Sequence, residues 1–154
     1  MSQELGPLPA GEGERVREAR RPRLLAWYAG SGGREDAGGP GSGWSLLAGN
    51  GREFARSAST YGTEKELGSA LRELWADRRA LRYQLVKSGG RYWSWTAYLP
   101  SRRSGVRDGE LIAVSARTYL RQDQCRAGMA GFPDALERVR RSDWDALLKG
   151  PRQR

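Results

Sequence analysis

The sequence predicts an α+β fold in which two tandem units, each of three strands and a helix, share one antiparallel sheet. Three observations support it: a segment that recurs after 58 residues without a gap, short alternating stretches bounded by Gly-rich turns, and two apolar stripes with helical spacing. The helices are expected on one face of the sheet, and a short C-terminal helix follows. The predicted divisions are a disordered tail over 1–22, repeats over 23–80 and 81–133, and a C-terminal helical segment with a basic tail over 134–154.

The repeat is clearest where an apolar strand leads through a tyrosine into a helix. Phe54–Ser57 and Tyr61 align with Ile112–Ser115 and Tyr119 at an offset of 58. Both copies then place apolar or small residues six, nine, ten and thirteen positions after the tyrosine, which marks one side of a helix. The paired positions are Leu67 with Cys125, Ala70 with Gly128, Leu71 with Met129, and Leu74 with Phe132.

In the first unit, turn residues and a capping signal define the elements. The Gly-Asn-Gly sequence at 49–51 is typical of a tight hairpin turn, and a Gly-rich loop over 30–43 comes one turn earlier. Thr63 is the expected N-cap of the helix, and Glu66 three residues later completes a capping box. The predicted strands are Leu24–Ala29, Trp44–Ala48 and Glu53–Ser57, and the predicted helix is Thr63–Asp77.

The second unit repeats this order with a longer second turn. Trp44–Ala48 aligns with Trp93–Ala97 at an offset of 49, so the change to 58 places nine extra residues in the turn over Leu99–Gly109. Its helix is expected to end before Pro133, because a residue that precedes a proline is disfavoured in the helical conformation. The predicted strands are Tyr83–Lys87, Tyr92–Leu99 and Glu110–Ser115, and the predicted helices are Arg121–Gly131 and Pro133–Leu148.

Alternation along Tyr92–Leu99 predicts which face of the sheet meets the helices. Trp93, Trp95 and Ala97 share the inner face, which leaves Tyr92, Ser94, Thr96 and Tyr98 outside. The repeated Ala-x-Ser sequence indicates a place where side chains must stay small. The predicted core is Trp44, Leu46, Phe54, Leu67, Leu71, Leu74, Trp93, Trp95, Ile112, Met129 and Phe132.

Each unit thus has an aromatic-rich strand, an Asn-Gly or Asp-Gly turn, an apolar strand with small residues, a tyrosine and a helix with a small-apolar pair. The residues are Trp44–Ala48, Asn50-Gly51, Phe54–Ser57, Tyr61 and Ala70-Leu71, then Trp93–Ala97, Asp108-Gly109, Ile112–Ser115, Tyr119 and Gly128-Met129. This order resembles the YegP-like family of small proteins over roughly residues 23–133. The resemblance implies tandem or dimeric β3-α-β units that share one sheet, and it implies no function.

The sequence offers little for catalysis or metal binding. It has no histidine and one cysteine, which excludes a structural zinc site and removes the commonest general base. Cys125 lies on the apolar side of its helix and is interpreted as a buried small residue, not a nucleophile. The Gly-rich loop lacks the Gly-Lys-Ser/Thr ending of a phosphate loop. We therefore expect no enzyme, no catalytic residue, no cofactor and no metal.

The sequence also bears on location and assembly. No stretch approaches the roughly 18 consecutive apolar residues of a membrane span, and no signal-peptide pattern opens the chain. A cytoplasmic protein without a membrane partner is expected. Because one chain holds both units, it can complete a sheet with internal pseudo-twofold symmetry by itself, which predicts a monomer.

Positive charge is concentrated in the second half. Residues 78–126 hold eleven basic and three acidic residues, a net +8 within a chain of net +9. Arginines bind phosphate well, but GC-rich coding also raises Arg, Ala and Gly together. The candidate binding face consists of Tyr92, Tyr98, Arg82, Arg91, Arg102, Arg103 and Arg107, with Arg78 and Arg79 in the same basic region.

Two functions fit this face. The favoured one is a protein-binding or scaffold module with an unknown protein partner. The alternative is a nucleic-acid-binding protein whose arginines track phosphates while the tyrosines stack on bases. The compositional source of the arginines and the presence of only two clear aromatic platforms favour the module.

Overall fold

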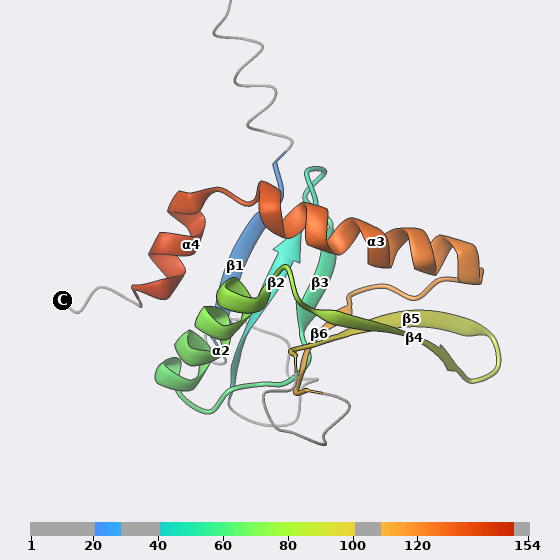
Figure 1. The fold of residues 1–154 in the computed structure, drawn as a ribbon, viewed down its shortest axis with the longest axis horizontal. Helices are drawn as coiled ribbons and strands as arrows, with labels where there is room; N and C mark the ends of the chain where they lie inside the picture. The colour runs from blue at the N-terminus through green and yellow to red at the C-terminus, as the bar shows by residue number, and fades with distance from the viewer. Residues whose placement is uncertain (1–20, 29–40, 101–108, 150–154) are drawn as a thin grey trace, which may run out of the picture.

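Three helices lie against one face of a six-stranded antiparallel sheet in the computed structural model, which describes residues 21–28, 41–100 and 109–149 (Figure 1). This confirms the predicted α+β class. The predicted disorder of the tail over 1–22 falls almost entirely outside the described residues. The elements are β1 (Arg23–Tyr28), β2 (Ser42–Leu47), β3 (Glu53–Ser57), α2 (Glu64–Asp77), β4 (Arg82–Ser88), β5 (Tyr92–Tyr98), β6 (Leu111–Ser115), α3 (Gln122–Arg138) and α4 (Arg141–Leu148).

The strand order is β1-β2-β3-β6-β5-β4, so β3 from the first half of the chain meets β6 from the second at the centre. There Arg56 lies opposite Val114, Ala55 opposite Ser115, and Ser57 opposite Ala113. Arg56 and Val114 are the aligned positions of the two halves. The central ladder is therefore built around a pair of corresponding residues, with the strands of each half following outward in the same order.

A β-bulge occurs at the same place in both halves. The register shifts between Leu46 and Leu47 opposite β3, and between Ala97 and Tyr98 opposite β6, which leaves Phe54 without a partner in β2 and Ile112 without a partner in β5. A bulge re-aims the extra side chain. Ile112 is fully buried, and the Phe54 ring lies 6.0 Å from the Trp95 ring. The bulge explains why apolar residues occur at successive positions of β6.

At the ends of the central strands, two serine side chains accept hydrogen bonds from backbone N–H groups of the neighbouring strands. The Oγ of Ser57 accepts a hydrogen bond from the Trp44 N–H at 3.3 Å, and the Oγ of Ser115 accepts one from the Trp95 N–H at 3.2 Å. Trp44 thus corresponds to Trp95, an offset of 51. The sequence alignment of Trp44 with Trp93 at an offset of 49 is wrong by two residues, although both alignments place the tryptophans on the same face.

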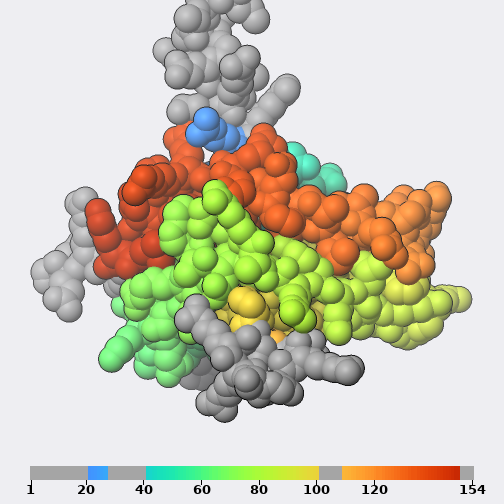
Figure 2. Space-filling view, viewed as in Figure 1, coloured from blue at the N-terminus to red at the C-terminus, as the bar shows by residue number. Residues whose placement is uncertain are grey.

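The core lies between the sheet and the helices. Figure 2 shows the outer surface of the molecule from the side of the helices. Trp95 is at its centre, with ring centroids 4.9 Å from Phe132 of α3 and 6.4 Å from Tyr83 of β4. The predicted core is confirmed: eight of its residues are buried, and Phe54, Trp93 and Met129 are partly buried against them. The core also contains Leu24, Leu136 and Trp144, which the sequence prediction missed.

The local signals for the first turn and helix operate as expected. Gly51 has φ +83° in the turn between β2 and β3, a conformation that favours glycine. Thr63 caps α2, its hydroxyl accepting from the Glu66 N–H at 3.1 Å. In a standard capping box the Glu66 carboxylate would accept from the N–H of the cap residue itself. Here it accepts from the N–H of Gly62, the residue before the cap, at 3.1 Å.

The predicted helix boundary at Pro133 is wrong. α3 runs without interruption from Gln122 to Arg138, with Pro133 inside it, and the break to α4 comes at Val139 and Arg140. A proline in a helix interior removes one backbone hydrogen bond and crowds the preceding turn. Phe132 and Leu136 on either side of it are fully buried against the sheet. This packing outweighs the local cost, and the predicted division at 133/134 falls inside the helix.

Gly128 of α3 provides a stability test. A Cβ at this position would overlap the Tyr119 hydroxyl, whereas a Cβ at Gly68 of α2 would meet only the Arg72 guanidinium at 3.7 Å. Alanine gains about 1 kcal/mol over glycine in a helix, but forced packing costs about 1–3 kcal/mol. We expect Gly128→Ala to lower the free energy of unfolding and Gly68→Ala to raise it, measured by urea denaturation. Stabilisation by both substitutions would contradict the Tyr119 contact.

Candidate functional site

The predicted binding residues do not form one cluster. In the β4–β5 ladder, Arg82 lies opposite Tyr98 at one end and Tyr92 opposite Ser88 at the other. The two tyrosines are six residues apart in β5, which separates them by roughly 20 Å. Arg91 precedes Tyr92 in the turn. The structure therefore brings Arg82 to Tyr98 and Arg91 to Tyr92, and keeps the tyrosines apart. Arg102, Arg103 and Arg107 lie outside the described residues.

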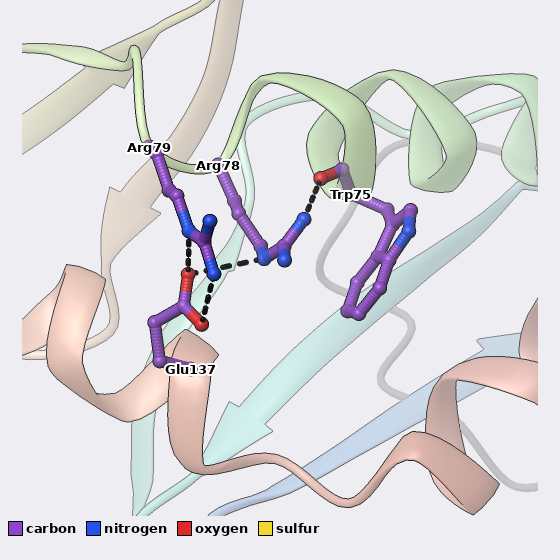
Figure 3. Close-up of polar contacts among 4 residues, drawn as sticks. All are labelled: Trp75, Arg78, Arg79 and Glu137. Carbon is purple, nitrogen blue, oxygen red and sulfur yellow. Dashed lines mark hydrogen bonds and ion pairs between the residues drawn. The ribbon is translucent and has the colours of Figure 1, made fainter.

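Arg78 and Arg79 belong to a different part of the molecule. Their Nε atoms lie 3.2 and 2.8 Å from Oε1 of Glu137, which joins the end of α2 to α3 (Figure 3). Arg78 also donates to the Trp75 carbonyl at 2.6 Å. The hydrogen bond from Arg79 is the main cause that lowers the pKa of Glu137 below its ordinary value. This ion-pair group connects helices and contributes nothing to the sheet face.

Arg56 occupies the centre of the helix-free face of the sheet. Its Nη2 donates to the Ala116 carbonyl of the other half at 3.4 Å, and its Nε lies within 2.9 Å of Glu53 Oε1 without hydrogen-bond geometry. The side chain is 39% exposed. The sequence analysis did not select Arg56, because its position opposite β6 depends on how the two halves pair.

Exposed apolar side chains gather near the tip of the β4–β5 hairpin. Leu120 is 71% exposed and Tyr92 is 44% exposed. Both flank the bridge in which Trp93 and Tyr119 exchange backbone hydrogen bonds of 2.7 Å, so they are neighbours on the side away from the helices. Among the described residues, the large hydrophobic side chains that are exposed are Leu25, Val86, Tyr92 and Leu120.

Val86 completes this group, here called the hairpin-end patch (Val86, Tyr92 and Leu120). Val86 pairs with Ser94, one diagonal step from Tyr92 on the same face, within reach of a large side chain. The hairpin and the beginning of α3 form one end of the molecule (Figure 1). Arg91 and Arg121 are the sequence neighbours of Tyr92 and Leu120, whereas the Arg117 guanidinium lies 5.2 Å from the centroid of the Tyr119 ring, which packs against Gly128 of α3. Of these, Arg121 is paired with Asp123 at 3.1 Å.

The first half of the chain makes the same bridge without the patch. Ser42 and Tyr61 exchange backbone hydrogen bonds of 2.8 Å, as Trp93 and Tyr119 do. The flanking residues are Gly41 and Gly62 there, where the second half has Tyr92 and Leu120. The bridge therefore forms without apolar side chains beside it. The fold does not account for an exposed tyrosine next to an exposed leucine.

The described residues present no obvious reactive group. The Cys125 side chain is fully buried against the core, and burial raises the pKa of its thiol, so the thiolate is disfavoured. Burial raises the pKa of Tyr83 to about 12. Within 21–28, 41–100 and 109–149, no three or more Cys, Asp and Glu residues come together as metal ligands. In the same part of the chain, no helix combines the length and apolar composition of a bilayer span.

Comparison with known proteins identifies no relative. No family model, no curated protein and no solved structure matches the chain.

Proposed function

We propose that this chain is a non-catalytic protein-binding module and that the hairpin-end patch is its docking site. The observation that carries the proposal is the exposed Tyr92–Leu120 pair, placed where the first half has two glycines. Contiguous exposed apolar side chains with a polar rim mark interaction sites. Tyr and Arg, together with Trp, are enriched at the energetic centres of protein interfaces.

The proposed partner segment has an apolar or aromatic side chain next to carboxylates. The apolar group would cover Tyr92, Leu120 and Val86, and the carboxylates would meet Arg91. Such charge complementarity steers encounter and fixes orientation. The net positive charge of the second half acts in the same direction.

Nucleic acid remains the alternative, and the geometry favours it less. Stacking on a single strand uses successive aromatic platforms, while Tyr92 and Tyr98 lie roughly 20 Å apart along β5. Tyr98 is further engaged, its hydroxyl 3.4 Å from Gln84 Oε1. Aliphatic Val86 and Leu120 beside Tyr92 suit protein side chains better than phosphates.

The two halves of the chain are further proposed to be tandem copies of one unit, as in the YegP-like family. The matched bulges, serine hydrogen bonds and isolated bridges support this. On this basis the chain completes its sheet alone and is a monomer. Light scattering that gives a dimer mass at micromolar concentration would contradict the proposed assembly.

Selection from a displayed library of random peptides tests the docking site. Enriched peptides should share an apolar or aromatic anchor next to Asp or Glu. Tyr92→Ala with Leu120→Ala should weaken their binding by about 30-fold or more, because loss of an interface anchor costs about 2 kcal/mol or more. Fluorescence anisotropy with labelled peptide gives the affinities. The first half tolerates glycine at both positions, so the variant should stay folded.

Leu25→Ala is the matched control, since Leu25 is exposed on the same face in β1, away from the patch. Equal weakening by Leu25→Ala, or peptides without a common anchor, would overturn the docking site. A shift assay with single-stranded DNA and RNA at low salt tests the alternative. Binding of an oligonucleotide that is lost in the Tyr92 and Leu120 variant would replace the protein partner with nucleic acid.

A further inference from the structure

A cavity of about 670 Å³ opens where the end of α2, the α3–α4 junction and Arg21, two residues before β1, meet. This volume is within the range of small-molecule sites. Its charged lining is four arginines and one glutamate. The lining residues are Arg21, Trp75, Glu137, Arg138, Val139, Arg140 and Arg141.

The glutamate of this cavity is already neutralised. Arg79 holds Glu137 through two hydrogen bonds of 2.8 and 3.3 Å, and Arg78 adds a third of 3.2 Å (Figure 3). Neither Arg78 nor Arg79 is among the lining residues. The glutamate therefore does not offset the charge of the arginines that face the hollow.

Three lining arginines have no carboxylate partner within the described residues: Arg21, Arg138 and Arg141. Arg138 ends α3 and Arg141 begins α4, which brings two positive charges together across a two-residue break. Like charges in one hollow repel each other, and a bound anion relieves that repulsion.

The backbone adds to the positive potential. No side chain caps the N-terminus of α4, whose helix dipole favours an anion there. Asp143 follows in the first turn but does not line the cavity. The Trp75 ring is already in contact, with the Arg78 guanidinium 3.8 Å from its centroid and the Trp144 ring at 4.8 Å. It is therefore a poor platform for stacking a further aromatic ring.

We propose that this cavity binds a polyphosphate chain, through Arg21, Arg138 and Arg141 and the N-terminus of α4. Arginine forks match phosphate oxygens in bidentate geometry. Several arginines suit a ligand with several negative charges. Because the tryptophan offers no free stacking surface, the site recognises the phosphates and not an attached base. This site is separate from the hairpin-end patch.

Isothermal titration of the full chain with inorganic tripolyphosphate tests the proposal. We expect saturable binding at low salt with one ligand per chain, and ATP should bind within about threefold of tripolyphosphate because the base adds no contact. Arg138→Gln with Arg141→Gln should weaken tripolyphosphate binding about tenfold or more, as charge-assisted pairs to phosphate are lost.

The control removes two positive charges elsewhere. Arg72→Gln with Arg126→Gln changes exposed residues of α2 and α3 that do not line the cavity. Binding should stay within about threefold of the unchanged chain. Equal weakening by the control pair would show general charge attraction and overturn the site. Absence of binding at about 1 mM ligand and low salt would do the same.

Discussion

Replacing Trp95 with alanine should lower the free energy of unfolding by roughly 3–5 kcal/mol, the usual cost of removing a large aromatic side chain from a core. Trp95 is fully buried and contacts rings from three other elements, Phe54, Tyr83 and Phe132. The total free energy of unfolding of a native protein is about 5–15 kcal/mol. The variant should therefore unfold at a much lower urea concentration, which circular dichroism measures.

Trp93→Ala is the matched control for this result. Trp93 lies on the same face of the same strand, two residues away, and is only partly buried. Replacing Trp93 with alanine should lower the free energy of unfolding by clearly less than replacing Trp95. A larger cost for Trp93 than for Trp95 would contradict the observed register of β5. Where Trp95→Ala does not fold at all, Trp95→Phe supplies a measurable intermediate value.

Removing the hydroxyls of Ser57 and Ser115 together should lower the free energy of unfolding by about 2–6 kcal/mol. Each Oγ is the acceptor for a backbone N–H of a fully buried tryptophan, Trp44 or Trp95. A buried donor that loses its acceptor costs about 1–3 kcal/mol. The double variant Ser57→Ala with Ser115→Ala should therefore show a large drop in the urea midpoint.

The matched double control is Ser45→Ala with Ser94→Ala. These serines lie on the helix-free face of β2 and β5 and are half-buried. Surface changes of this kind stay within about 0.5 kcal/mol each. If both double variants lose the same stability, the effect belongs to general loss of strand serines and the assigned hydrogen bonds are not its source.

The sequence predicted the sheet and core because the signals there are local and repeated. Alternation in β5 assigns Trp95 to the inner face whatever the alignment offset, since offsets of 49 and 51 share the same parity. The Thr63 cap is equally local. The helix end at Pro133 was mispredicted because burial of Phe132 and Leu136, a tertiary effect, decides the length of α3.

The candidate site was less accessible to sequence reasoning. Tyr92 was selected from alternation, but Leu120 lies between strand and helix, where no periodicity assigns a face. The sequence alignment of the two halves could have drawn attention to Leu120, because the first half has Gly62 at the matching position. The arginine-lined cavity could not be inferred, because Arg21 and Arg141 lie 120 positions apart in the sequence and only the packing of α3 and α4 brings them to one hollow.

The unlike pair at the centre of the sheet bears on which strands can join. If two first halves met through β3, Arg56 would face Arg56, and like charges directly opposite each other are destabilising. If β3 meets β6, arginine faces Val114 and no such repulsion arises. The central pair therefore discriminates against self-association of the first half and in favour of its own chain's second half. Arg56, a charged residue in the central pair of the sheet, therefore disfavours the pairing of identical first halves from neighbouring molecules.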